Sequence, residues 1–314
     1  MDKRYRYLFG PVPSRRFGRS LGVDLSRPKT CSLDCIFCQL GRSSVKSVDR
    51  KEYVPTEMVL AELKDWISTD GRADYITLSG SGEPTLHSRF GDVLKFIRKH
   101  TAVPALLLTN GTMLHHPEVR AAACQADTVK ASLSAWDDLS YRRINRPHPA
   151  LRFDTLVEGE KAFRKEYTGT FFLEVFLVRG INTAPDDIKR IAALTREIAP
   201  DRVQLNTAVR PPAEEVVAAL NREELKQIST FFDPEAEIIA ASELTDGDPL
   251  SRNQDAILAM LRRRPCTADD IAGAFTMHMN EVSKYLGILI RNKRIVTEHR
   301  DGLVYYTVPS GRRR

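Results

Sequence analysis

Short apolar segments alternate with amphipathic segments along most of the chain. Six runs predict strands, over Leu21–Leu25, Tyr75–Leu78, Ala105–Leu108, Thr128–Leu133, Phe171–Val178 and Val203–Leu205. Apolar residues at helical spacing predict helices over Pro55–Trp66, Ser88–Lys99, Pro117–Cys124, Phe153–Tyr167, Pro185–Ile198 and Arg222–Phe232. Strict alternation of strand and helix predicts a parallel sheet with right-handed crossovers. A doubly wound sheet and a barrel both fit, and in either the chemistry belongs at the carboxyl ends of the strands.

The pattern changes near residue 240. The segment 240–252 is polar and contains Gly and Pro, so we predict a linker there, between a domain at 1–239 and a smaller one at 253–314. In the smaller domain we expect one helix around Leu258, a second that Thr267 caps, and a third over Met279–Ile290. A hairpin around Asp301-Gly302 follows.

Three helices and a hairpin in this order resemble a winged-helix module. In nucleic-acid-binding examples of that module the third helix enters a groove. Polar and basic side chains accompany that helix and the hairpin here: His278, Asn280, Lys284, Arg291 and Arg300. Winged helices also serve in protein contacts and dimerisation, so both uses stay open.

Composition and charge describe an ordinary globular chain of 314 residues with a mild basic excess. Its hydrophobic fraction of 42% suits a protein that buries a core, and no apolar run predicts a membrane span or a signal peptide. The formal net charge of +6 favours an anionic partner, with nucleic acid first. Because Arg312, Arg313 and Arg314 supply part of that excess, a mildly basic surface is the plainer explanation.

Three of the five cysteines, Cys31, Cys35 and Cys38, fall in one short loop after the first predicted strand. Three thiolates at CxxxCxxC spacing can bind three irons of a four-iron cluster, which normally takes four thiolates, and leave one iron for another ligand. A structural zinc site and a trio of inert thiols are the alternatives. Cys124 and Cys266 stand apart and are predicted to be small buried hydrophobes. The odd number and the clustering fit a reducing cytoplasm rather than a disulfide framework.

This loop, with Phe37 just before its last cysteine, resembles the signature loop of the radical SAM enzymes. The resemblance implies a [4Fe–4S] cluster on Cys31, Cys35 and Cys38, with S-adenosylmethionine (SAM) on the open iron and Phe37 near its adenine. It also implies that the first domain is a partial (β/α)6 barrel, so the fold class is α/β with a small C-terminal winged helix.

A second motif and several polar strand ends extend the resemblance. Gly80-Ser81-Gly82-Glu83-Pro84 resembles the family's Gly-Gly-Glu motif, with Ser81 in place of the first glycine, which implies that backbone atoms around Ser81 and Gly82 and the Glu83 side chain hold the methionine amino group. Polar side chains at later strands are implied as further contacts to SAM: Asn110, Lys130, Ser132, Ser134 and Asn206. We also expect a basic barrel mouth, which would be formed by Arg15, Arg16, Arg19, Arg142, Arg143, Asn145, Arg146, His148, Arg179, Asn182 and Arg210.

The segments 9–41 and 79–86 resemble a radical SAM subfamily related to the wybutosine-synthesis-like Fe–S oxidoreductases. Those tRNA enzymes carry extra N-terminal cysteines for a second cluster, and this chain has none before Cys31. Our first hypothesis is a cytoplasmic enzyme that cleaves SAM to a 5′-deoxyadenosyl radical and modifies RNA or tRNA, with a flavodoxin- or ferredoxin-type electron donor. The alternative is a radical SAM enzyme that modifies a protein or peptide, with the winged helix as partner-binding module. A third hypothesis is an iron–sulfur DNA-binding regulator without turnover.

Overall fold

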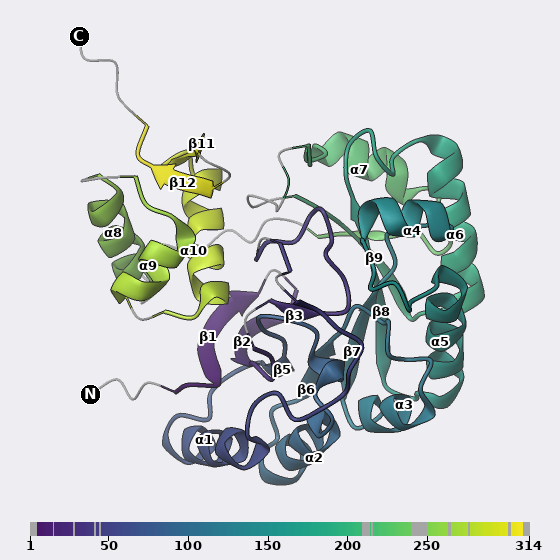
Figure 1. Cartoon of the computed structure of the whole chain (residues 1–314), viewed down its shortest axis with the longest axis horizontal. Coiled ribbons are helices and arrows are strands. Elements are labelled where there is room, and N and C mark those ends of the chain that lie inside the picture. The colour runs from purple at the N-terminus through teal and green to yellow at the C-terminus, as the bar shows by residue number, and fades with distance from the viewer. Residues whose placement is uncertain are drawn as a thin grey trace.

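A computed structural model describes residues 5–14, 16–27, 29–40, 42–43, 45–208, 214, 216–239, 250–262, 265–275, 277–300 and 303–309. Its centre is a curved sheet of eight strands in the order β1-β2-β5-β6-β7-β8-β9-β10, with helices packed along its outer face (Figure 1). These strands are β1 (Leu8–Ser14), β2 (Gly18–Val23), β5 (Tyr75–Leu78), β6 (Ala105–Leu108), β7 (Thr128–Ser132), β8 (Thr170–Leu177), β9 (Arg202–Thr207) and β10 (Glu237–Ile238).

The six strands predicted from the apolar runs correspond to β2 and to β5 through β9, and their pairing is parallel as predicted. The helices are α1 (Thr56–Thr69), α2 (Phe90–His100), α3 (Pro117–Ala123), α4 (Asp138–Ile144), α5 (Phe153–Glu166), α6 (Pro185–Ile198) and α7 (Arg222–Ser229). Of these, α4 was not predicted; Asp137 caps it and hydrogen-bonds the amide of Ser140. No helix in the described part of the chain is long and apolar enough to cross a membrane.

The segment before β2 is basic and rich in glycine and proline, a composition that predicts a loop, but it forms a strand. Leu8–Ser14 forms β1, which pairs antiparallel with β2 and has an irregular register between Phe9 and Val12. Pro11 and Pro13 lack the N–H that a central strand needs, but β1 lies at the edge of the sheet, where proline is tolerated. Glycine and proline therefore marked an edge strand here, and not a loop.

The second domain contains the elements predicted for it: α8 (Leu250–Leu261), α9 (Ala268–Phe275), α10 (Met279–Arg291) and the antiparallel hairpin of β11 (Val296–Arg300) and β12 (Leu303–Thr307). Thr267 caps α9, because its hydroxyl accepts a hydrogen bond from the amide of Asp270. The first helix already starts at Leu250, inside the predicted linker; residues 240–249 and the turn Asp301-Gly302 lie outside the described residues.

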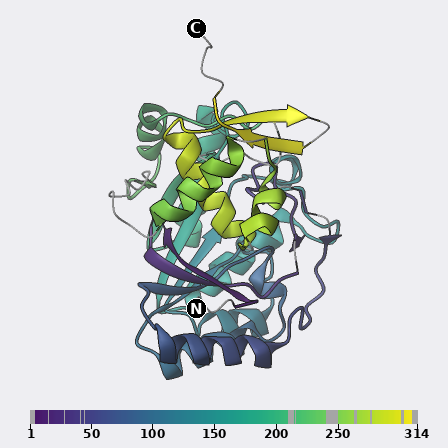
Figure 2. The same ribbon diagram turned by 90° about the vertical axis from the view of Figure 1, so that its left-hand side faces the viewer.

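The second domain has its own core and packs against the first. Ile257, Leu261 and Leu286 are buried in this core, and so is Cys266, as predicted. Cys124, at the end of α3, is only half-buried against the main core. Figure 1 shows the domain beside β1, and the turned view of Figure 2 shows its helices in front of the sheet. Helix α10 makes the contact with β1.

Candidate active site

The cysteine loop follows β2 and is fixed by backbone hydrogen bonds to two neighbouring loops. On one side, Lys29 N–H donates to the carbonyl of Ser81 (2.7 Å) and Glu83 N–H donates to the carbonyl of Thr30 (3.1 Å). On the other side, the amide of Ile36 donates to the end of α4. Residues 30–31 also form the short strand β3 (Thr30–Cys31), which pairs with β4 (Val45–Lys46). The loop is therefore held between the glycine-rich loop after β5 and the residues that follow β7.

Two asparagines reach the thiols from other strands and helices. The side-chain nitrogen Nδ2 of Asn110, at the end of β6, lies 3.5 Å from Cys31 Sγ. Nδ2 of Asn145, at the end of α4, lies 3.3 Å from Cys35 Sγ. Burial, and next the charge of Glu83, raises the pKa of Cys31 to about 12. Burial also raises the pKa values of Cys35 and Cys38. Without a metal the thiols stay protonated, so metal binding must release protons.

A first cavity, of about 260 Å³, opens beside this loop at the carboxyl ends of β5, β6 and β7. It brings together most of the residues predicted to hold the cluster and SAM: Cys31, Cys35, Phe37, Gly82, Glu83, Asn110, Lys130 and Ser132. Lys130 and Ser132 share a face of β7, as their alternation predicts. The first cavity is also lined by Thr109 and Tyr141, two polar residues that the sequence did not single out.

A second cavity, of about 360 Å³, adjoins the first, and Phe37 and Lys130 line both. It is lined by two more of the predicted residues, Cys38 and Asn206. Phe37 stacks on Phe176 with ring centroids 4.1 Å apart. The stacked rings thus stand where the two cavities meet.

Glu174 on β8 organises the polar side of the second cavity, and the sequence analysis missed it. Its carboxylate pairs with Lys130 Nζ (3.0 Å), with Arg16, and with the amide nitrogen of Asn206 (3.3 Å). The sequence does hold one signal, because Glu174 is a lone charge inside the apolar run 171–178. A charge in such a position needs buried partners. Its partners come from β7, β9 and the β1–β2 turn, which no local pattern reveals.

Ser81 does not line either cavity. Its amide (3.0 Å) and hydroxyl (2.6 Å) both donate to Oδ2 of Asp24, which follows β2. The side chain instead faces a separate interdomain space, of about 580 Å³, which His278 also lines. The resemblance implies a role for backbone atoms around Ser81 only, and its side chain is engaged by Asp24.

Comparison with known proteins assigns this arrangement to a family. Residues 25–194 match the model of the radical SAM superfamily, which covers the cysteine loop, both motifs and the strands around the first cavity. The chain belongs to the radical SAM superfamily. Membership implies an iron–sulfur cluster and SAM as cofactors and a SAM-dependent enzyme, and the mostly parallel sheet is typical of this fold.

The chain is also similar to several known proteins and solved structures. A UPF0026 protein of Helicobacter pylori is 32% identical over 95% of this chain and 96% of its own length. A protein of Brachyspira hyodysenteriae named GTPase Obg is 34% identical over 96% of this chain, but the chain spans only 45% of that protein. A solved structure of TYW1 with a lysine-pyruvate adduct matches with a TM-score of 0.51 at 18% identity, over 72% of this chain and 77% of that one. At that identity the match shows the fold alone.

The residues of the cysteine loop suit the radical SAM cluster. Three half-buried thiols from one loop supply three ligands, and amide groups stand beside two of them. Within the described residues no three Cys, His, Asp or Glu side chains converge on one metal ion. A cluster does not require that, because each thiolate binds a different iron. The Tyr141 hydroxyl is buried at the wall of the first cavity and, within the described part of the chain, has no hydrogen-bond partner, so it is available to a bound group.

Glu83, which belongs to the second motif, accepts hydrogen bonds from two loops of the chain itself. Its Oε1 accepts hydrogen bonds from the Thr85 amide and from the hydroxyls of Thr85 and Thr109, and its Oε2 accepts one from the Asn110 amide (2.8 Å). Burial raises the pKa of Glu83 although these four donors oppose the shift. The carboxylate therefore ties the loops after β5 and β6 together. Only Oε2 retains room for a further donor such as the methionine amino group.

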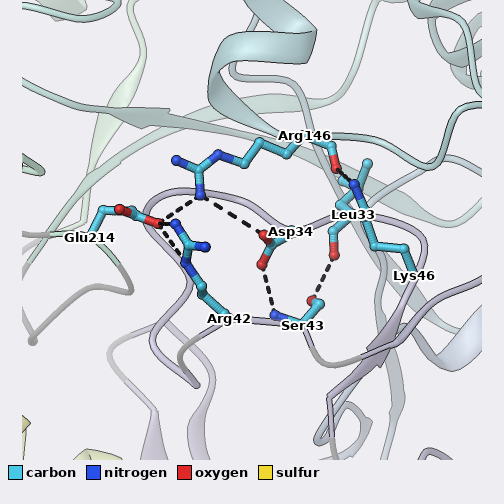
Figure 3. A network of polar contacts seen from close by, with 7 residues as sticks. All are labelled: Leu33, Asp34, Arg42, Ser43, Lys46, Arg146 and Glu214. Carbon is cyan, nitrogen blue, oxygen red and sulfur yellow. Dashed lines mark hydrogen bonds and ion pairs between the residues drawn. The ribbon is translucent and has the colours of Figure 1, made fainter. Parts of the chain in front are cut away.

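The expected basic barrel mouth is largely neutralised by carboxylates. Figure 3 shows Arg42 and Arg146 converging on Glu214, with Arg146 also near Asp34 of the cysteine loop (3.9 Å). The hydrogen bonds from Arg146, the larger cause, and from Arg42 lower the pKa of Glu214. This network fastens the cysteine loop to the segments after α4 and β9, a structural use of cations that their positions in the sequence do not show.

Other members of the predicted mouth also have structural partners. Arg142 pairs with Asp138, Arg179 pairs with Glu224, and Arg16 with Glu174. Two more hold loops: Asn182 donates to the carbonyls of Ser134 and Phe176, and the amide of His148 donates to the carbonyl of Ser32. Arg19 and Arg143 are exposed, whereas Arg15 and Arg210 lie outside the described residues.

A buried carboxyl behind the first cavity gives a pH-dependent prediction. Glu160 on α5 is fully buried, and neither oxygen has a hydrogen-bond partner within the described residues. Burial raises its pKa well above 4.5. The unfolded chain loses this proton at lower pH than the folded protein, so stability falls as the pH rises from 4.5 to the raised pKa. The loss is about 1.4 kcal/mol for each pH unit in that window.

We expect Glu160→Gln, which cannot ionise, to unfold at a higher temperature than the wild type, with a difference that grows from pH 5 to pH 8. Thermal unfolding at several pH values measures this difference. Glu158→Gln on the same helix is the matched control, because Glu158 is exposed and its removal costs little at any pH. A constant difference between the Glu160→Gln variant and the wild type would show that Glu160 does not titrate in this window.

Proposed function

We propose that this radical SAM protein reductively cleaves SAM to a 5′-deoxyadenosyl radical and uses it to modify RNA, tRNA in particular. The substrate class is inferred from the charged side chains of the second cavity. Three cationic side chains and one carboxylate line it: Arg16, Lys130, Lys284 and Glu174. Because cationic side chains outnumber carboxylates in this described lining, we infer a substrate that brings an anionic group, and a nucleotide brings phosphate.

In this proposal the chain's own residues bind and orient the cluster and SAM and exclude solvent. Cys31, Cys35 and Cys38 would hold the cluster, which when bound supplies the electron that breaks a carbon–sulfur bond of SAM. Asn110 and Asn145 direct amide donors at two of the thiolates, and such second contacts tune a cluster's reduction potential. The backbone of Gly82 lies against the cysteine loop and shapes the wall of the first cavity. A reduced flavodoxin- or ferredoxin-type protein is the proposed electron donor.

The test is 5′-deoxyadenosine formation by anaerobically reconstituted, reduced protein with and without total cellular RNA. We expect RNA to stimulate product formation and nuclease treatment of the RNA to abolish the stimulation. Product formation that is indifferent to RNA would overturn the RNA assignment and leave SAM cleavage in place. Purified tRNA and ribosomal RNA fractions then distinguish the two main classes of RNA.

A protein or peptide substrate is the second candidate, and one observation favours it. Among the described arginines around the barrel mouth, Arg16, Arg142, Arg146 and Arg179 are paired with carboxylates, so less cationic surface remains for a phosphate backbone than the sequence predicts. Stimulation of 5′-deoxyadenosine formation by a nuclease-treated, protein-containing cell fraction, and not by RNA, would select this candidate.

A further inference from the structure

The third helix of the second domain is docked on the barrel through its first residue. His278 caps α10, and its ring stacks on Phe9 of β1 with centroids 4.3 Å apart and planes 9° apart. Nδ1 accepts a hydrogen bond from the amide of Asn280 (3.1 Å), so the ring proton belongs on Nε2. Nε2 therefore donates to Oδ2 of Asp24, at 2.8 Å.

The acceptor Asp24 connects the docked helix to the SAM-binding motif. The same oxygen that accepts from His278 also accepts from the amide and hydroxyl of Ser81. Glycines make room for this contact, because a Cβ on Gly22 would come within 2.0 Å of the Phe9 ring and one on Gly80 within 2.0 Å of the Asp24 carboxylate. One carboxylate thus joins β2, the glycine-rich loop and the second domain.

Two further contacts fix the direction of the helix. The amide of Gly10 donates to Glu281 Oε1 (2.9 Å), and Glu281 in turn accepts from the amide of His278 within the cap of α10. One turn on, the hydroxyl of Ser283 lies 3.5 Å from the carbonyl of Gln39, just past the last cysteine of the loop. The helix is therefore attached at β1 and at the cysteine loop.

This docking directs polar residues of α10 into the active site. Asn280 and Lys284 are four residues apart, so they share one face of the helix, and both line the second cavity with Lys130, Glu174 and Asn206. His278, Asn280 and Lys284 belong to the polar residues named for a nucleic-acid or a protein contact, and in the described conformation all three face the barrel.

We propose that α10 is a wall of the second cavity, in which Asn280 and Lys284 bind the phosphate of the substrate while His278, through Asp24, keeps the helix in place. The proposal takes its substrate class from the proposed function. The second domain is then part of the substrate site and not only an external binding module. Among the described residues, three cationic side chains and one carboxylate line this cavity, so its lining is suited to an anion.

Pyrophosphate binding tests the wall without any assumption about the natural substrate. Reconstituted full-length protein saturated with SAM is titrated with pyrophosphate by calorimetry, as wild type, Lys284→Ala and Arg294→Ala. We expect affinity to fall about tenfold or more in Lys284→Ala, the effect of losing one charge-assisted contact. The control Arg294→Ala removes an exposed cation of the same domain and should change affinity less than about twofold. Lys284→Gln, which keeps most of the side-chain length, should reproduce the loss if charge is responsible.

Several outcomes overturn the proposal: no measurable pyrophosphate binding by the wild type, equal losses in Lys284→Ala and Arg294→Ala, or no loss in either. The same variants assayed with RNA separate this proposal from the proposed function. If RNA fails to stimulate the wild type but pyrophosphate affinity depends on Lys284, the RNA assignment fails and the wall stands. If RNA stimulates all variants equally and pyrophosphate affinity is unchanged, the wall fails and the RNA assignment stands.

His278 acts through the helix, so its test includes rescue. We expect His278→Ala to weaken pyrophosphate binding although Lys284 is intact, because the helix loses its cap and its bond to Asp24. His278→Asn restores a capping side chain and an amide donor and should recover most of the affinity. Full affinity in His278→Ala would show that the bridge to Asp24 does not position the wall.

Discussion

Cys35→Ala is expected to lose most of its iron and all SAM cleavage. Cys35 supplies the central thiolate of the loop, it is the acceptor beside the Asn145 amide, and two thiolates cannot hold a four-iron cluster firmly. Iron content and 5′-deoxyadenosine formation after anaerobic reconstitution and reduction measure both losses. Cys124→Ala is the matched control, because Cys124 is a half-buried thiol at the end of α3 and outside the cysteine loop. Retention of iron and cleavage in Cys35→Ala would refute the cluster assignment.

Gly82→Ala is expected to lower the affinity for SAM about ten- to a hundredfold. A Cβ at this position would lie 1.8 Å from the carbonyl oxygen of Thr30, a backbone atom that also accepts the amide hydrogen bond of Glu83. The two loops must separate to accommodate the methyl group, and overpacking of this kind costs about 1–3 kcal/mol. Because Thr30 directly precedes Cys31, the displacement reaches both the cluster loop and the first cavity.

Equilibrium dialysis with labelled SAM measures this loss, alongside the thermal stability of each variant. The control is Gly273→Ala on α9, where an added Cβ meets nothing within 4 Å. Alanine in that helix should leave SAM binding unchanged and raise stability by about 0.5–1 kcal/mol. Wild-type SAM affinity in Gly82→Ala would show that the glycine-rich loop does not form the SAM site.

Local features of the sequence were enough to predict the six parallel strands and the cysteine loop. Strand β6 is a four-residue apolar run, β5 is a largely apolar one, and each leads into a polar loop. The spacing of Cys31, Cys35 and Cys38 is contained within eight residues. The elements that departed from these signals include β1 and α4. The edge strand β1 contains prolines that read as a loop, and α4 is a seven-residue helix too short to show periodicity.

The partners of the site residues could not be predicted, because they depend on contacts across the fold. Asn110 reaches Cys31 from 79 positions away, and Asn145 reaches Cys35 from 110. The bond between His278 and Asp24 spans 254 positions and depends on how two domains pack. For the same reason the sequence showed the arginines of the barrel mouth but not the carboxylates that pair with them.

The most direct test of the account is the fate of SAM when the reconstituted protein is reduced under anaerobic conditions. The account predicts that methionine and 5′-deoxyadenosine form in equal amounts, that both require the reductant, and that both disappear in Cys35→Ala. Intact SAM after reduction of a protein that holds its full complement of iron would contradict it.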